Sequence, residues 1–247
     1  MFKLKKALTL ACLSCLGAFL LIQLYFFSQV LLMRYVDPQS TAFQRSELLR
    51  LSLSAKTLHW SQEWVPLEKM SNQLKKAVIV SEDDLFARHD GVQWGAIERA
   101  WKKNQSSSSG KNVSMGLLQN KADSGKIVGG STITQQLAKN LFLSSERTFV
   151  RKAQEFLITV YLETLLPKKR ILEIYLNCVE WGEGVFGAQA AAKHYFSTSA
   201  QSLSAAQAAR LAVMLPRPKY FEKLPASAYL STRAEMIEQR MPGAVLP

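Results

Sequence analysis

The longest hydrophobic stretch of the chain lies near its N-terminus. Residues 7–33 contain no charged side chain and are rich in Leu, Phe and Ala. About 20 apolar residues suffice for a helix to cross a bilayer, so the stretch predicts a membrane-spanning anchor. It exceeds the roughly 7–15-residue core of a secretory signal, although a cleaved export signal is the alternative. Lys3, Lys5 and Lys6 precede it, which favours a cytoplasmic tail of residues 1–6 and export of the rest.

Beyond this run the hydrophobic positions follow a helical period. Residues 34–73 are largely polar and are interpreted as a linker, with helical stretches allowed around 47–53. A compact domain is predicted over 74–247. Apolar spacing predicts helices at 131–142, 148–166, 168–178, 187–196 and 204–215, and no run alternates as a strand does. The sequence therefore predicts a mainly α fold.

Three further segments complete this pattern. The apolar run 77–80 leads into Ser81-x-x-Asp84, whose spacing is that of a helix N-terminus. Trp94, Ile97 and Trp101 stand at helical spacing and predict another helix. Residues 104–126 include a serine-rich run and few large apolar groups, so they predict a mobile loop.

Composition adds a charge argument to this picture. The chain is 48% hydrophobic and 20% charged, which suits a globular domain. Its net charge of +12 suits an anionic membrane surface or an anionic substrate. Nucleic acid is the usual partner of a basic protein, but an exported domain rarely meets it, so no nucleic-acid partner is expected. The scattered Cys and His residues predict neither a disulfide nor a metal site.

The acidic run from Glu82 to Asp84 is the first candidate for chemistry. Asp83 and Asp84 disfavour further negative charge, which raises the pKa of at least one of the three carboxyl groups. A carboxylate with a raised pKa suits removal of a proton from a sugar hydroxyl near neutral pH. The structural alternative is that acidic residues stabilise the dipole of a helix's first turn.

Two later segments carry polar side chains that can act together. Thr132 and Gln135 have the spacing of a capping box, and a helix start can bind an anion. Gln135, Gln136 and Lys139 share one helix face, a feature that an ordinary capped helix does not explain. In the next segment Arg147, Arg151 and Lys152 surround Glu155. The pair Arg151–Glu155 can be a surface salt bridge worth about 0.2–0.5 kcal/mol, whereas the whole cluster can hold a pyrophosphate.

Five ordered motifs make the chain similar to the peptidoglycan glycosyltransferase family, in its short monofunctional form. The resemblance runs from about residue 74 to 220. The motifs are Glu82-Asp83-x-x-Phe86-x-x-His89-x-Gly91, Gly129-x-Ser131-Thr132-Ile133-Thr134-Gln135-Gln136-Leu137-x-Lys139-Asn140, Arg151-Lys152-x-x-Glu155, Ile171-Leu172-Glu173-x-Tyr175-Leu176-Asn177 and Gly187-x-x-x-Ala191-Ala192-x-x-Tyr195-Phe196 with Leu203-Ser204 and Leu211-Ala212.

The chain departs from the family pattern at a few places. Gln93 stands where monofunctional members often have Asp, and residues 104–126 are longer than usual. Gln207 stands where Glu is usual, and a Ser204-x-x-Gln207 capping box accounts for that change because either residue can serve at the third helical position. These departures bear on the acceptor side of the site.

The resemblance implies a lysozyme-like helical fold with a membrane-contacting jaw, and polymerisation of lipid II into β-1,4 glycan with inversion at MurNAc C1. Glu82 is then the general base and Glu155 the second essential glutamate. A divalent cation such as Mg²⁺, bound with the substrate pyrophosphate, is left open. The implied substrate-binding residues are Asp83, Phe86, His89, Ser131, Thr132, Gln135, Gln136, Lys139, Asn140, Arg147, Arg151 and Lys152.

The resemblance also implies partners and a location. Lipid II, the growing lipid-linked glycan and the bilayer are the expected partners, together with other proteins of cell-wall synthesis or division. The expected location is the bacterial inner membrane, with one span and the catalytic domain outside the cytoplasm. Two other readings are a lytic transglycosylase or lysozyme-like hydrolase, and an inactive membrane-anchored scaffold. The cation clusters favour the polymerase, because cleavage of neutral glycan has no pyrophosphate to hold.

Overall fold

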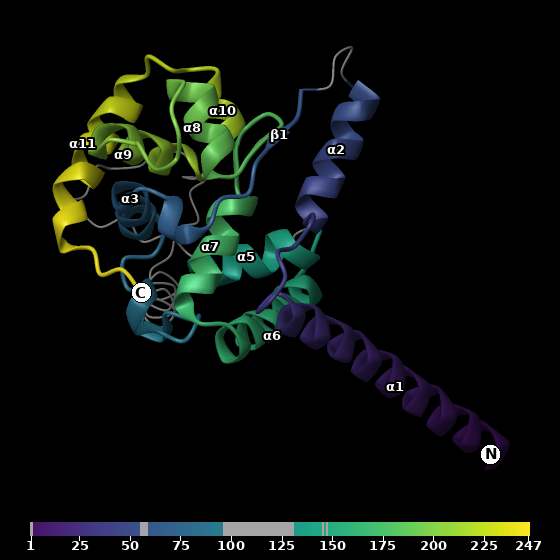
Figure 1. Cartoon of the computed structure of the whole chain (residues 1–247). Coiled ribbons are helices and arrows are strands. Elements are labelled where there is room, and N and C mark those ends of the chain that lie inside the picture. The colour runs from purple at the N-terminus through teal and green to yellow at the C-terminus, as the bar shows by residue number, and fades with distance from the viewer. Residues whose placement is uncertain (1, 55–58, 96–130, 145, 147) are drawn as a thin grey trace, which may run out of the picture.

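A computed structural model describes the chain except for residues 1, 55–58, 96–130, 145 and 147 (Figure 1). The predicted loop 104–126, Arg147 and, apart from Trp94, the helix predicted from Trp94, Ile97 and Trp101 lie outside the described residues. The predicted mainly α architecture is confirmed. A single small sheet interrupts the helices of the described part of the chain.

Helix α1 (Phe2–Leu32) projects from the rest of the molecule (Figure 1). Within the described residues, one helix, Lys5–Leu32, is long and apolar enough to cross a membrane by length and composition. Its C-terminal part packs on α6 (Phe149–Leu165), where Gln23 and Val30 are buried. Gln23 and Gln154 exchange amide hydrogen bonds of 2.9 and 3.1 Å.

The segment 34–73 contains regular structure. Helix α2 (Ala42–Ser54) packs against α5 (Ile133–Phe142). Strand β1 (Ser61–Gln62) pairs in parallel with β3 (Val185–Phe186), and β2 (Glu180–Gly182) pairs with β3 in the antiparallel sense. These strands of two or three residues are too short for an alternating pattern to appear in the sequence. The 3-10 turn Leu67–Lys69 then leads into the core.

The predicted helix start at Ser81-x-x-Asp84 is wrong. Helix α3 (Asn72–Glu82) begins after Ser71, whose hydroxyl oxygen accepts a hydrogen bond from the backbone N–H of Gln73, and it ends at Glu82. Asp83 is the C-cap, and the 3-10 turn Phe86–Arg88 follows. Residues 77–80 are all buried inside α3, so the run shows no helical period from which its boundaries could be predicted.

The five helices predicted by spacing are confirmed as α5, α6, α7 (Lys168–Cys178), α8 (Ala188–Phe196) and α9 (Ala205–Met214). Most of these helices begin one or two residues after the predicted start, because the predicted ranges included cap residues such as Thr132 and Ser204. Both predicted capping boxes are present. Helices α10 (Pro218–Glu222) and α11 (Ala228–Arg240) and the 3-10 turn Met241–Gly243 were not predicted.

The helices form two groups that meet near the end of α3. Helices α3, α9 and α11 pack together, and α5 packs against α6, α7 and α2 (Figure 1). Buried apolar side chains of α7, among them Ile171, Leu172 and Tyr175, lie in the core. Glu82 at the end of α3 therefore comes close to the polar face of α5.

Candidate active site

Glu82 lies where α3 ends, and its carboxylate is held by two side chains. Gln136 Nε2 donates to Oε2 at 2.8 Å, and the Ser81 hydroxyl donates to Oε1 at 3.3 Å. The Tyr175 hydroxyl donates to Gln136 Oε1 at 3.0 Å, which orients the amide of Gln136. Burial raises the pKa of Glu82, and the charge of Asp83 adds to the rise, although the hydrogen bonds from Gln136 and Ser81 oppose it. The predicted direction is confirmed, but burial is the larger cause.

Asp83 is buried behind Glu82 and connects it to α5. Its Oδ2 accepts from the backbone N–H of Ile133 at 3.0 Å, at the start of that helix. Its Oδ1 lies 2.8 Å from His89 Nε2 and accepts from Gln93 Nε2 at 2.7 Å. A carboxylate at a helix N-terminus is stabilised by the exposed N–H groups and by the helix dipole. Asp83 thus positions α5 relative to Glu82.

The loop after Asp83 is fixed by the backbone of Gly91. The Gly91 N–H donates to His89 Nδ1 at 3.0 Å, so the proton of a neutral His89 is on Nε2 and faces Asp83. The Gly91 carbonyl accepts from the Thr132 hydroxyl at 2.6 Å. Gly91 has φ +81°, and a Cβ there would lie 2.7 Å from side-chain carbons of Glu163 and Thr159. This position therefore requires glycine.

The cation cluster of α6 is centred on a buried carboxylate. Glu155 is 3% exposed, and its Oε2 accepts from Arg151 Nη1 at 2.7 Å. Its Oε1 forms an ion pair with Lys152. The predicted pair Arg151–Glu155 is thus present, but it is shielded on the Glu155 side. Arg151 Nε is buried and has no hydrogen-bond partner among the described residues, so the guanidinium retains an unused donor.

One cleft of about 730 Å³ brings the polar side chains together. Its predicted lining residues are Glu82, Ser131, Gln135, Gln136, Lys139, Asn140, Arg151, Lys152 and Glu155. Other predicted site residues lie outside its lining. Hydrogen bonds of Asp83, His89 and Thr132 join the loop after α3 to the start of α5. Phe86 is fully buried, and the Lys168 ammonium lies 4.6 Å from its ring centroid.

The cleft also has lining residues that the sequence did not suggest. They are Phe43 of α2, Ser81, Leu143, Ser144, Val213, Leu215, Pro216, and Tyr229 and Arg233 of α11. Three of them, Phe43, Tyr229 and Arg233, come from elements far from the motifs in sequence, and α11 itself was not predicted. The other six lie close to motif residues in the sequence. Arg233 adds a cation on the side of α11. A basic residue on an amphipathic helix gives no local signal that would distinguish it from surface charge.

The described residues offer no set of ligands for a metal ion. No group of three or more His, Cys, Asp or Glu side chains in this part of the chain could hold one. Both carboxylate oxygens of Glu155 already pair with cations. The site can therefore combine a partly buried base with a group of cations that attract an anion, and no step is assigned to a metal.

Comparison with known proteins identifies the family. The transglycosylase family model matches residues 52–242. The chain is 49% identical over 231 residues to a biosynthetic peptidoglycan transglycosylase of Paraburkholderia xenovorans, covering 93% of this chain and 89% of that protein. Proteins of the same name from Herminiimonas arsenicoxydans (49% over 229 residues, 92% of each chain) and Bordetella pertussis (46% over 242 residues, 98% of this chain and 95% of the relative) are similarly close. The chain therefore belongs to the transglycosylase family and is a lysozyme-like helical glycosyltransferase of peptidoglycan biosynthesis.

Proposed function

We propose that the enzyme polymerises lipid II, with Glu82 as general base. The 4-hydroxyl oxygen of the acceptor GlcNAc attacks C1 of the donor MurNAc and forms the new C–O bond. The bond from C1 to the pyrophosphate oxygen breaks, polyprenyl pyrophosphate leaves, and the hydroxyl proton passes to Glu82. Attack opposite the leaving group converts an α-phosphate into a β-1,4 link.

The observation that carries this proposal is the composition of the cleft. Glu82 lines the same cavity as Lys139 and Arg151. Negative charge develops on the leaving pyrophosphate, and preorganised cations stabilise such charge strongly in a site from which water is excluded. Arg147 is expected to add to this charge. Glu155 holds Arg151 and Lys152 in place, so we assign it a positioning role, and no divalent ion is needed for that role.

Burial of Glu82 supports its assignment as the base. A raised pKa brings the carboxylate closer to the basicity that proton removal near neutral pH requires. Gln136 holds Oε2, so the carboxylate has a defined orientation towards the cleft. Asp83, His89, Phe86 and Thr132 are assigned to positioning, because their contacts are with the protein.

The remaining cleft side chains are assigned to substrate binding. Ser131, Gln135, Gln136 and Asn140 offer neutral donors and acceptors that suit sugar hydroxyl and amide groups. A lytic transglycosylase would also need a carboxyl group near a glycan. The cations beside Glu155 favour the polymerase, since neutral glycan offers them no anionic partner.

We further propose a membrane-bound arrangement for the enzyme. Residues 1–6 are a cytoplasmic tail, 7–33 the span through the inner membrane, 34–73 the connection, and 74–247 the extracytoplasmic domain, whose jaw contacts the bilayer. The apolar helix Lys5–Leu32 supports this division. Since the substrate's lipid stays in the bilayer, anchoring raises the effective concentration of enzyme near it. Other proteins of cell-wall synthesis or division are further expected partners.

Purified enzyme and labelled lipid II test the assignment. Glu82→Gln should lower polymerisation by about 10²–10⁴-fold, the usual contribution of a general base, with the helical circular dichroism unchanged. Asp84→Asn is the matched control, because Asp84 is the exposed neighbouring carboxylate and contacts Arg240 at 3.5 Å. Wild-type polymerisation by Glu82→Gln would refute the base. Release of soluble fragments from finished sacculi, without polymer from lipid II, would support lytic activity instead.

A further inference from the structure

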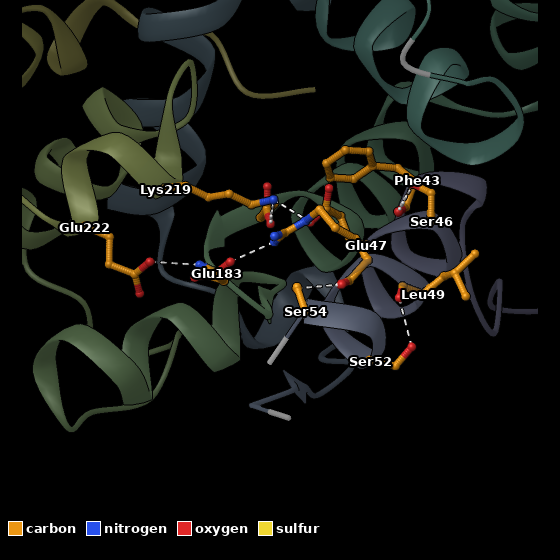
Figure 2. Close-up of polar contacts among 11 residues, drawn as sticks. Phe43, Ser46, Glu47, Leu49, Ser52, Ser54, Glu183, Lys219 and Glu222 are labelled. Atoms are coloured by element: carbon orange, nitrogen blue, oxygen red, sulfur yellow. Dashed lines mark hydrogen bonds and ion pairs between the residues drawn. The ribbon is translucent and has the colours of Figure 1, made fainter. Parts of the chain in front are cut away.

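Helix α2 carries both a residue that lines the cleft and, one turn further along the same face, a cluster of charges. Phe43, in the first turn of α2, lines the cleft together with Leu215 and Pro216. One turn later, Glu47 is directed towards Lys219 of α10 (Figure 2), and it is not among the residues that line the cleft. The side chain of Glu47 is 13% exposed.

A single ammonium group joins α2 to two other elements. Lys219 forms an ion pair with Glu47 and lies 3.3 Å from Glu180 Oε1 in β2. Arg50 of α2 adds a second link, since its guanidinium donates to Glu47 Oε2 at 2.8 Å and to Glu183 Oε1 at 2.8 Å. The cluster therefore ties α2 to β2, to the turn that follows it and to α10.

Shielding distinguishes this cluster from ordinary surface ion pairs. The side chains of Glu47 and Glu180 are 13% and 8% exposed. Exposed pairs contribute little because water screens them, whereas removing one partner of a shielded pair leaves a charge uncompensated. Burial raises the pKa of Glu47, but the hydrogen bonds from Lys219 and Arg50 outweigh burial and lower it overall. Glu47 is therefore ionised and depends on these cations.

We propose that Glu47 and Lys219 form a positioning pair that holds the two walls of the cleft at a fixed separation. Helix α2 packs on α5, which carries the polar face of one wall. Lys219 belongs to α10, which follows Leu215 and Pro216 of the other wall in the chain. Neither member of the pair lines the cleft, so the pair acts through Phe43 and through the spacing of the walls. This inference rests on the proposed lipid II polymerisation for its kinetic test.

Steady-state kinetics on full-length enzyme with lipid II provide the first test. Lys219→Met should lower kcat/KM about tenfold, mainly through a higher KM, because small misplacements of binding groups are costly. Lys219→Arg should restore activity to within about threefold, since arginine keeps the charge and can bridge both carboxylates. Glu47→Gln keeps the side-chain shape and should lower kcat/KM as Lys219→Met does. It replaces Lys219→Met in the test if Lys219→Met does not fold.

Lys193→Met is the matched control. Lys193 forms a 2.5 Å ion pair with Glu63, and both side chains are about half exposed. Neither residue contributes to α2, α10 or the cleft lining. This variant should polymerise within about twofold of wild type, as expected for an exposed pair.

Hydrogen exchange of the α2 amides tests the pair without relying on activity. Lys219→Met should accelerate exchange in α2 by about tenfold, because α2 loses a contact that opposes its local opening, and Lys193→Met should not. Unchanged α2 exchange in a folded Lys219→Met variant, or equal activity of the Met and Arg variants, would overturn the positioning pair. If wild-type enzyme makes no polymer from lipid II, the proposed function fails, and exchange still decides the pair.

Discussion

Asp83 is hydrogen-bonded to three groups, two in the loop that follows it and one at the start of α5. Its donors are the backbone of Ile133, the amide of Gln93 and, through Nε2, His89. Hydrogen bonds to a charged acceptor are strong, and they compensate the cost of burying the carboxylate. Because Asp83 directly follows Glu82, these bonds also fix Glu82 relative to α5. The resemblance implies substrate binding for Asp83, and its contacts in the structure are with these protein groups.

Gln93→Asp tests this arrangement at the position where the chain departs from its family. Gln93 donates to Asp83 Oδ1 at 2.7 Å, and an aspartate there would present a second negative charge to a buried carboxylate. We expect a loss of about 1–3 kcal/mol in the free energy of unfolding at pH 8. The loss should shrink at acidic pH as one carboxyl group takes up a proton. Chemical denaturation across pH measures it, and an unchanged midpoint at pH 8 would contradict the contact.

Glu180→Gln tests a carboxyl group that lies outside the cleft. Burial raises the pKa of Glu180 to about 7, and the charge of Lys219 only partly opposes this rise. Because the folded-state pKa lies above the ordinary value, wild-type stability is retained at acidic pH and falls as pH rises through about 7. Glutamine does not ionise, so the Glu180→Gln variant should not show this fall in stability over the same pH range.

The two proteins should therefore unfold at similar temperatures at pH 4.5. At pH 8 the glutamine variant should be the more stable by up to about 3 kcal/mol, at 1.36 kcal/mol for each pKa unit. Thermal unfolding over pH 4.5–8 measures the difference. A constant difference over that range would show that Glu180 keeps an ordinary pKa.

Sequence patterns identified the residues of the site that lie in local motifs. Four of these residues belong to short polar motifs and line the cleft, namely Glu82, Gln136, Lys139 and Glu155. Phe43 could not be identified in the same way. It enters the cleft because α2 packs on α5, and that contact between distant segments leaves no pattern along the chain.

At the scale of elements, the sequence predicts helix N-termini best where a capping box is present. Hydrogen bonds at a cap involve residues three apart, so they are encoded locally. At α9 the Ser204 N–H donates to Gln207 Oε1 at 2.9 Å, and the Gln207 N–H donates to the Ser204 hydroxyl oxygen at 3.3 Å. The start of α3 was predicted wrongly because its central residues 77–80 are buried on all sides and show no period.

The capping box of α9 predicts a graded response at Gln207. Gln207→Glu keeps an acceptor for the Ser204 N–H and should leave stability unchanged. Gln207→Ala removes that acceptor and should cost about 0.5–1 kcal/mol, as the loss of one net hydrogen bond does. Thermal unfolding of the three proteins side by side measures this order. Unchanged stability of Gln207→Ala would mean that the box contributes nothing.

On the scale of the whole molecule, α1 is joined to the catalytic domain by a polar contact within an apolar surface. Gln23 exchanges two hydrogen bonds with Gln154 and accepts a third from the Tyr161 hydroxyl at 3.3 Å. Phe26 packs edge-on against Phe142, with ring centroids 5.3 Å apart. Helix α1 is thus docked along α6 as well as connected through the chain.

Gln23→Leu should weaken this docking while preserving the apolar character of α1. Hydrogen bonds between helices in apolar surroundings contribute about 0.6–2 kcal/mol, so a loss of that size is expected for the full-length enzyme in detergent. Ser28→Leu is the control, because the Ser28 hydroxyl bonds to the Tyr25 carbonyl of its own helix. Thermal unfolding measures both variants. Equal effects of the two changes would contradict a specific role for Gln23.

In the proposed membrane arrangement, docking of α1 would set a direction for the reaction. A helix of 31 residues is about 46 Å long and exceeds the roughly 30 Å of the hydrocarbon core, which leaves its docked end near the membrane surface. In the proposed topology, an anchor held against α6 cannot swivel freely about its connection. The cleft would then face the bilayer at a constant angle, and substrate would reach it by lateral diffusion in two dimensions. Each new disaccharide would enter from the same side, and the glycan would grow away along one fixed path.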